Sequence, residues 1–172
     1  MVQVAICIGS NSGDRFSYMR RMEAALQVVL NAEVTCSSLM ETEPVGVAPG
    51  QPWYLNRVLS GWYRKNPFML LDECRLIEVQ LGRINKGLRM ERTADIDILL
   101  FGKETVATGE LAIPHPAVLS RRFCLEGLYQ ILPDALIPGS GKTVREHHSI
   151  MPPRILSQVI RFIVPEGELH GD

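Results

Sequence analysis

Two aspartates separated by a single residue are the strongest chemical signal in the sequence. Asp95 and Asp97 lie in the otherwise apolar run 94–101, which is typical of a strand. Because side chains alternate along a strand, both carboxylates are expected on one face, with their Cα atoms about 7 Å apart. Like charges at that spacing repel, so a divalent cation held by carboxylate and phosphate oxygens is the favoured explanation. The alternative is the solvated outer face of an edge strand.

Four basic residues precede the aspartates. Arg83, Lys86, Arg89 and Arg92 fall in the polar segment 82–93, which we expect to form a loop. Arginine side chains pair with phosphate oxygens and neutralise the charge that develops during phosphoryl transfer. This placement favours a polyphosphate clamp, although a solvated basic loop would have the same composition.

Two other groups of residues offer contacts for a ligand. His115 stands between two prolines, which position it stiffly for a phosphate contact, and Arg121 follows shortly after. Tyr54 and Asn56 are able to stack on and hydrogen-bond a flat heterocycle. The residue types alone favour simpler alternatives, namely an exposed turn histidine, a core tyrosine and a turn asparagine.

Two motifs that look like functional sites are assigned to ordinary local structure. The segment 139–143 resembles the end of a phosphate-binding P-loop, but Leu136 stands where that motif requires its first glycine, so a turn is expected. His147 and His148 have no cysteine or carboxylate at ligand spacing, so an exposed turn or the start of a helix is expected.

The order of the predicted elements is typical of an α+β, ferredoxin-like βαββαβ fold, an antiparallel sheet with both helices on one face. Asp14 and Asn66 are expected to cap the two helices. The elements are a strand at 2–8, a helix at 16–30, a strand at 34–40, a loop at 41–53, a strand at 54–63, a helix at 67–81, the loop at 82–93 and a strand at 94–101. A C-terminal extension follows, with a strand near 111–113, a helix near 119–131 and a tail, 147–172, that carries few signals.

Length and charge exclude several classes of protein. The 172 residues are expected to form one domain, 1–172. The net charge is −1, and acidic and basic residues are mixed along the chain, so neither nucleic acid nor a membrane surface is an expected partner. No apolar run is long enough to span a bilayer. The cysteines are expected to be buried thiols of a cytoplasmic monomer; they are Cys7, Cys36, Cys74 and Cys124.

Six motifs occur in an order and spacing that resembles the 6-hydroxymethyl-7,8-dihydropterin pyrophosphokinases, over the chain to about residue 146. They are Gly9-Ser10-Asn11-Ser12-Gly13-Asp14-Arg15; Glu41-Thr42-Glu43-Pro44-Val45-Gly46; Gln51-Pro52 with Tyr54-Leu55-Asn56; Ile77-Glu78 with Leu81-Gly82-Arg83; Arg92-Thr93 with Asp95-Ile96-Asp97-Ile98-Leu99-Leu100-Phe101-Gly102; and Ile113-Pro114-His115-Pro116 with Arg121 and Phe123. The chain departs from the family in the loop 82–93, where Met90-Glu91 replaces the usual Trp-Gly-Pro and Asn85 replaces an arginine, and at Ala94, where a larger aliphatic residue is usual.

The resemblance implies an activity and a set of site residues. It implies transfer of the β,γ-pyrophosphate of ATP to the pterin hydroxymethyl group, with release of AMP, in folate biosynthesis. It also implies that Asp95 and Asp97 bind two Mg²⁺ ions. The implied catalytic and phosphate-contacting residues are Arg83, Arg92, His115 and Arg121, with Glu78 near the nucleotide. The implied pterin pocket consists of Thr42, Pro44, Val45, Tyr54, Asn56 and Phe123, with Tyr54 and Phe123 on either side of the ring.

Two other functions remain as alternatives. The first is another two-metal nucleotidyl or phosphoryl transferase on the same fold, because paired aspartates would serve it equally well. The second is an RNA-binding or small-ligand regulatory module. An RNA-binding sheet would need stacking aromatics, which the strand at 2–8 lacks, and the aspartate pair would repel phosphate without a metal.

Overall fold

The computed structural model describes residues 1–30, 33–45, 50–83 and 92–164. In chain order its elements are β1 (Val2–Ser10), α1 (Arg15–Val29), β2 (Thr35–Cys36), β3 (Leu39–Thr42), β4 (Tyr54–Tyr63), α2 (Pro67–Gln80), β5 (Asp95–Phe101), β6 (Val106–Ala107), β7 (Ala112–Ile113), the 3₁₀ helix η1 (Pro116–Val118), α3 (Arg122–Ile131), β8 (Leu136–Ile137), β9 (Lys142–Thr143), α4 (Val144–Ser149), α5 (Pro153–Leu156) and β10 (Ile160–Ile163). The main sheet has the strand order β10-β3-β4-β1-β5, and β2 also pairs with β4.

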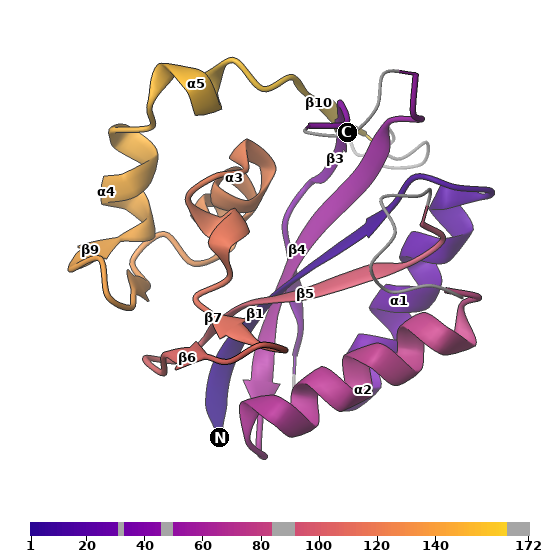
Figure 1. Ribbon diagram of the computed structural model, residues 1–172, viewed down its shortest axis with the longest axis horizontal. Helices are drawn as coiled ribbons and strands as arrows, with labels where there is room; N and C mark the ends of the chain where they lie inside the picture. Colours follow the sequence, from indigo (N-terminus) through magenta and orange to yellow (C-terminus); the bar gives the residue numbers. More distant parts are fainter. Residues whose placement is uncertain (31–32, 46–49, 84–91, 165–172) are drawn as a thin grey trace, which may run out of the picture.

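The predicted ferredoxin-like order is confirmed in the segment from β1 to β5 (Figure 1). β1 is central and pairs antiparallel with β4 on one side and with β5 on the other. β3 pairs antiparallel with the far edge of β4. The antiparallel sheet of an α+β fold, which the sequence predicts, is therefore the framework of the molecule.

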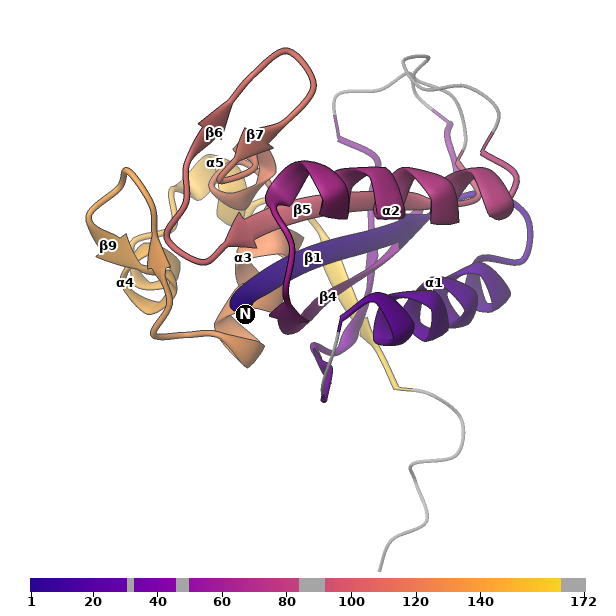
Figure 2. The ribbon, with the colours of Figure 1, turned by 90° about the horizontal axis from the view of Figure 1, so that it is seen from below.

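Helices cover both faces of this sheet (Figure 1, Figure 2). α1 and α2 pack on one face, as predicted, and Val4, Ile6 and Ile8 of β1 contribute to the core beneath them. α3 packs on the other face, where Ala5 and Cys7 contribute to a second core, and α4 lies against α3. Because β1 packs against both cores, it is continuously apolar from Val4 to Ile8 rather than alternating.

The two predicted helix caps are both present. The Asp14 carboxylate accepts a hydrogen bond from the Ser17 N–H at 3.0 Å, and α1 begins at the next residue. The Asn66 side chain accepts one from the Met69 N–H at 3.0 Å, with Pro67 in the first turn of α2. These bonds satisfy backbone donors that a helix start otherwise leaves without partners.

The strand predicted at 34–40 is wrong in its extent. It forms two short strands, β2 and β3, with Ser37 between them. The Ser37 hydroxyl accepts the Val58 N–H at 3.0 Å, so a side chain takes the place of a ladder partner there. β3 then continues to Thr42, and the predicted loop at 41–53 begins after that residue.

The C-terminal extension holds more elements than predicted, since β6, β8, β9 and α5 were not expected. The helix expected near 119–131 begins only at Arg122, after the short helix η1. The tail contains β10, a strand that was not predicted and that pairs antiparallel with β3. The strand expected near 111–113 is confirmed as β7, which forms a hairpin with β6.

The segment 139–143 and the pair His147-His148, which were predicted to be ordinary local structure, form a hairpin and part of a helix. The segment 139–143 consists of the turn of the β8–β9 hairpin, where Gly139 and Gly141 have positive φ angles of 78° and 70°, and of β9 itself. His148 lies in α4 and stacks on Tyr129 with ring centroids 4.0 Å apart, so it packs against α3 rather than standing exposed. Its Nε2 atom is 3.0 Å from the Glu126 carboxylate.

The predicted burial of the cysteines is confirmed for three of the four, and Cys36 is half-buried. None of the four, all of which lie in the described part of the chain, forms a disulfide. Within the described part of the chain, the helices all lack the length and hydrophobicity needed to cross a bilayer.

α3 approaches the sheet closely through Gly127. A Cβ atom at this position would lie 2.4 Å from Val58 Cγ2 and 2.8 Å from Val58 Cβ, both on β4. Such distances are far below van der Waals contact, so only glycine permits this packing. The same approach places the N-terminus of α3 beside the polar end of the sheet.

Replacement of Gly127 by alanine is expected to destabilise the protein although alanine favours helices, because overpacking of a core costs about 1–3 kcal/mol. Gly109→Ala is the matched control, since a Cβ atom there would have no neighbour within 4 Å. Urea unfolding should show a loss for Gly127→Ala and a change within about 0.5 kcal/mol for the control. Equal stabilities of the two variants would contradict the close packing.

Candidate active site

A pocket of about 290 Å³ opens on the α3 side of the sheet, where β3, β4 and β5 meet the start of α3. Ten of the thirteen site residues expected from the sequence line it. The lining residues are Thr42, Glu43, Val45, Tyr54, Asn56, Arg92, Asp95, Asp97, His115, Ala117, Arg121, Phe123 and Cys124. The fold thus brings residues from four distant segments to one place. The other three expected residues, Pro44, Glu78 and Arg83, are not part of the lining.

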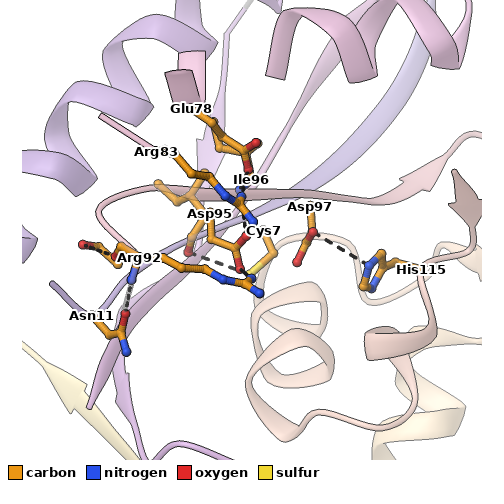
Figure 3. Close-up of polar contacts among 11 residues, drawn as sticks. Cys7, Asn11, Glu78, Arg83, Arg92, Asp95, Ile96, Asp97 and His115 are labelled. Carbon is orange, nitrogen blue, oxygen red and sulfur yellow. Dashed lines mark hydrogen bonds and ion pairs between the residues drawn. The ribbon is translucent and has the colours of Figure 1, made fainter. Parts of the chain in front are cut away.

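An ion-pair network holds Asp95 (Figure 3). Arg83 donates to Asp95 Oδ1 at 2.7 Å, and Arg92 donates to Asp95 Oδ2 at 2.8 Å. The same Arg83 nitrogen also donates to Glu78 Oε1. Glu78 further accepts the Ile96 N–H at 2.9 Å, directly between the two aspartates. Four charged side chains from α2, β5 and the segments before it therefore fix the start of β5.

Glu78 lies outside the lining of the pocket. The residue is only 1% exposed and sits behind Arg83, away from the pocket. The position near the nucleotide that the resemblance implies stays a prediction; the partners of Glu78 in the structure include Arg83 and the Ile96 N–H. Arg83, with a side chain 10% exposed, likewise faces carboxylates rather than open solvent. Arg83 bonds to Asp95, and Glu78 bonds to Arg83, so both residues help to hold Asp95 in place.

Asp97 carries a strongly perturbed carboxyl group. Partial burial, followed by repulsion from Asp95 and Glu78, raises the pKa of Asp97 to about 7, against a smaller opposing effect of the two arginines. Although 42% of its side-chain surface is reachable by solvent within the pocket, its neighbour across the ladder is the buried Cys7. Burial and the two neighbouring carboxylates together therefore outweigh the effect of the arginines and disfavour the ionised form of Asp97.

His115 is half-buried and oriented by its own turn. Its backbone N–H donates to the Leu99 carbonyl at 3.0 Å, after a cis peptide bond between Ile113 and Pro114. Its Nδ1 atom accepts the Ala117 N–H at 3.1 Å, so the ring proton of the neutral form lies on Nε2. Nε2 is 3.8 Å from Asp97 Oδ1, and burial lowers the pKa of His115. The simpler prediction of an exposed turn histidine is wrong.

The other wall of the pocket offers an amide and two aromatic rings. Asn56 is buried and donates its side-chain N–H to the Thr42 hydroxyl at 2.8 Å, which fixes the amide orientation. A Cβ atom on Gly9 would lie 2.7 Å from Asn56 Oδ1, so the glycine makes room for this side chain. Tyr54 and Phe123 also line this wall. A core tyrosine and a turn asparagine, the simpler alternatives, are not what the structure has.

Asn11, to which the sequence analysis gave no role, holds the backbone of the pocket residue Arg92. It is 1% exposed, its Oδ1 accepts the Arg92 N–H at 2.7 Å, and its own N–H donates to the Arg92 carbonyl at 3.0 Å. Its side-chain amide donates to the Pro52 carbonyl at 3.4 Å. The signal was the Gly-Ser-Asn turn after β1, since asparagine often bonds to nearby backbone in turns. Asn11 ties three chain segments together.

Some sequence predictions lie outside the described residues. These are Lys86 and Arg89 of the basic cluster, Gly46, and the departures from the family pattern at Asn85 and Met90-Glu91.

Comparison with known proteins places the chain in a family. The sequence profile of the 7,8-dihydro-6-hydroxymethylpterin-pyrophosphokinases (HPPK) matches residues 5–133. The chain belongs to this family. It is 42% identical over 127 residues to the 2-amino-4-hydroxy-6-hydroxymethyldihydropteridine pyrophosphokinase of Bacillus subtilis, covering 73% of the chain and 75% of that protein. The enzyme of the same name from Haemophilus influenzae is 34% identical over 141 residues, covering 81% and 88%.

Larger proteins also contain this domain. The folate synthesis bifunctional protein of Arabidopsis thaliana is 37% identical over 134 residues, which are 76% of the chain and 27% of that protein. The structure of Plasmodium falciparum HPPK-DHPS with pteroate superimposes with a TM-score of 0.67 at 13% sequence identity. The superposition covers 86% of the present chain and 42% of the Plasmodium chain. At this identity the likeness supports the shared α+β fold alone. The HPPK match ends before α4, α5 and β10.

Replacement of Glu78 by alanine is expected to cost about 3 kcal/mol of unfolding free energy, because it removes an acceptor from the buried Arg83 and the Ile96 N–H. Asp134→Ala is the control, since the pair of Asp134 with Arg145 is exposed and should cost under about 1 kcal/mol. Urea unfolding measures both. Similar small losses for both variants would show that the Glu78 pair does not support the site.

Proposed function

We propose that the protein is an ATP-dependent pyrophosphokinase of folate biosynthesis. It transfers the β,γ-pyrophosphate of ATP to the hydroxymethyl group of 6-hydroxymethyl-7,8-dihydropterin and releases AMP. One arrangement supports the proposal most strongly: the pair Asp95 and Asp97, with flanking cations, opens into the same pocket as Tyr54, Asn56 and Phe123. Membership of the HPPK family supports the same assignment.

Asp95 and Asp97 would hold two Mg²⁺ ions. The donor set fits this cation, because hard carboxylate oxygens on one strand face are its usual protein ligands. The raised pKa of Asp97 also fits, since burial and then the repulsion from Asp95 and Glu78 disfavour its ionised form, which a cation would stabilise. Bound Mg²⁺ supplies neutralisation of phosphate charge and helps align the triphosphate for in-line transfer.

Cationic and hydrogen-bonding side chains would hold the triphosphate. Arg92 and Arg121 line the pocket and carry planar guanidinium groups that match phosphate oxygens. His115 presents Nε2–H, so in its neutral form it donates a hydrogen bond to a phosphate oxygen rather than accepting a proton. Arg83 acts through Asp95, which it orients. These groups stabilise charge on the transferred pyrophosphate and on the departing AMP.

The opposite wall would bind the pterin. Tyr54 and Phe123 supply flat apolar surfaces for the ring, and the Asn56 amide, already oriented by Thr42, supplies directional hydrogen bonds. Arg121 donates to the Val45 carbonyl at 2.9 Å, which ties the Pro44–Val45 segment to the phosphate side. The acceptor hydroxyl and the triphosphate would then meet between the two walls. Catalysis rests on this positioning and on charge neutralisation, without a dedicated general base.

Another two-metal nucleotidyl or phosphoryl transferase is the alternative, and none of the comparisons above favours it. We propose a cytoplasmic location, because four cysteines that form no disulfide are typical of a reducing compartment.

Incubation of the purified protein with ATP, Mg²⁺ and 6-hydroxymethyl-7,8-dihydropterin is expected to form AMP in amounts equal to the pterin diphosphate, resolved by chromatography. Asp97→Ala should lower the rate by at least about 100-fold, because one carboxylate cannot hold the metal pair. Asp134→Ala, at an exposed position, should leave it unchanged. Formation of ADP or of free pyrophosphate would support the alternative transferase, and a fully active Asp97→Ala would contradict the metal assignment.

A further inference from the structure

The C-terminal strand β10 lies beyond the part of the chain that matches the family and completes one edge of the sheet (Figure 1). It pairs antiparallel with β3, so that Ile160 lies opposite Thr42 and Arg161 opposite Glu41. The Val159 N–H just before it donates to the Glu43 carboxylate at 3.1 Å. β10 therefore covers the end of β3 that leads into the candidate active site.

Arg161 also brings β10 into contact with Trp53, the residue that precedes β4. Its guanidinium carbon lies 4.2 Å from the centroid of the Trp53 ring, and its Nη1 atom is 4.0 Å from Glu41 Oε2. Glu41 also pairs with Arg15 at 2.9 Å, and Arg15 donates to the Trp53 carbonyl at 2.6 Å. We call these four residues the arginine–tryptophan cluster. They line a cavity of about 500 Å³ that is separate from the candidate active site.

The cluster and the candidate active site share two strand ends. Glu41 and Trp53 belong to the cluster, while the next residues, Thr42 and Tyr54, line the active-site pocket and lie opposite each other in the ladder. Successive side chains point to opposite faces of a strand. The cluster therefore lies on one face of the strand ends whose other face presents Thr42 and Tyr54 to the pocket.

We propose that the arginine–tryptophan cluster is a positioning element for pterin binding, with Arg161 and Trp53 as its positioning residues. The proposal rests on the proposed function. Strand ends open easily, and a ligand binds more weakly in proportion to the fraction of molecules whose site is open or misplaced. The cation–π contact and the β3–β10 ladder keep the ends of β3 and β4 together before the pterin arrives. ATP contacts on the β5 side should not depend on them.

The first test is steady-state kinetics of Arg161→Ala. The KM for the pterin is expected to rise about three- to tenfold, while kcat and the KM for ATP change less than twofold. Arg161→Lys, which keeps a cation beside the ring, should retain most of the affinity. Arg154→Ala is the matched control, because Arg154 is an exposed arginine of the same C-terminal segment. An unchanged pterin KM in Arg161→Ala, or equal changes in both KM values, would overturn the proposal.

Trp53→Ala provides a second variant with a further prediction. The double variant Trp53→Ala/Arg161→Ala should raise the pterin KM no more than the stronger single variant, because both remove the same contact. Additive losses would show that the two residues act separately and would overturn the proposal.

Hydrogen exchange of the ligand-free protein separates this proposal from the proposed function. Amides of residues 53–56 are expected to exchange faster in Arg161→Ala than in Arg154→Ala, whatever the protein's activity. If the wild-type protein forms no AMP with the pterin, the proposed function fails, and the exchange rates alone then decide whether the cluster holds the strand ends. Equal exchange in the two variants would overturn the positioning role.

Discussion

Three carboxylates crowd the start of β5, and the rest of the site is arranged around their charge. Asp95 and Asp97 share one strand face, and Glu78 accepts the backbone N–H that lies between them. Arg83 bridges Glu78 and Asp95 with little exposure to solvent, and Arg92 closes the other side of Asp95. Two arginines thus satisfy two of the three carboxylates, while Asp97 keeps a raised pKa. The fold tolerates this repulsion because the buried pair beneath fixes the strand, and we infer that the remaining charge is there to attract a cation.

The sheet connects this charged end to the opposite wall of the pocket. β4 contributes Leu55 to the core under α1 and α2, and on its other face it presents Tyr54 and Asn56 to the pocket. Helices on both faces keep the strand from moving, and the small residue Gly127 lets α3 come close enough to add Phe123. A rigid sheet covered on both sides is a suitable scaffold, because phosphoryl transfer depends on positioning rather than on covalent chemistry.

Sequence patterns predicted the elements whose signal is long or chemically marked. β4, the caps of α1 and α2, and the aspartate pair on β5 each rest on a run of several residues or on a side chain with one structural role. β10 was not predicted because it is only four residues long and its side chains do not alternate between buried and exposed, since Arg161 and Phe162 are both exposed. The roles of Glu78 and Asn11 were not visible either, since each depends on partners brought together by the tertiary fold. A pattern along the chain shows which residues can do chemistry, but not which of them lie beneath the site.

The pH dependence of unfolding is the most direct test of the charge crowding. Above its unfolded pKa of about 4 and below its folded pKa of about 7, Asp97 keeps a proton only in the folded protein, so its contribution to stability falls as pH rises through this range. In a chelating buffer at pH 8, the Asp97→Asn variant should therefore unfold at a temperature about 2–4 °C above that of the wild type. The shift is small because the Asp97 side chain is 42% exposed. At pH 5 the difference between the two unfolding temperatures should shrink. Excess Mg²⁺ with a non-hydrolysable ATP analogue should reverse the order at pH 8, since only the wild type keeps both ligands. An Asp97→Asn variant that is no more stable than the wild type at pH 8 would contradict the account.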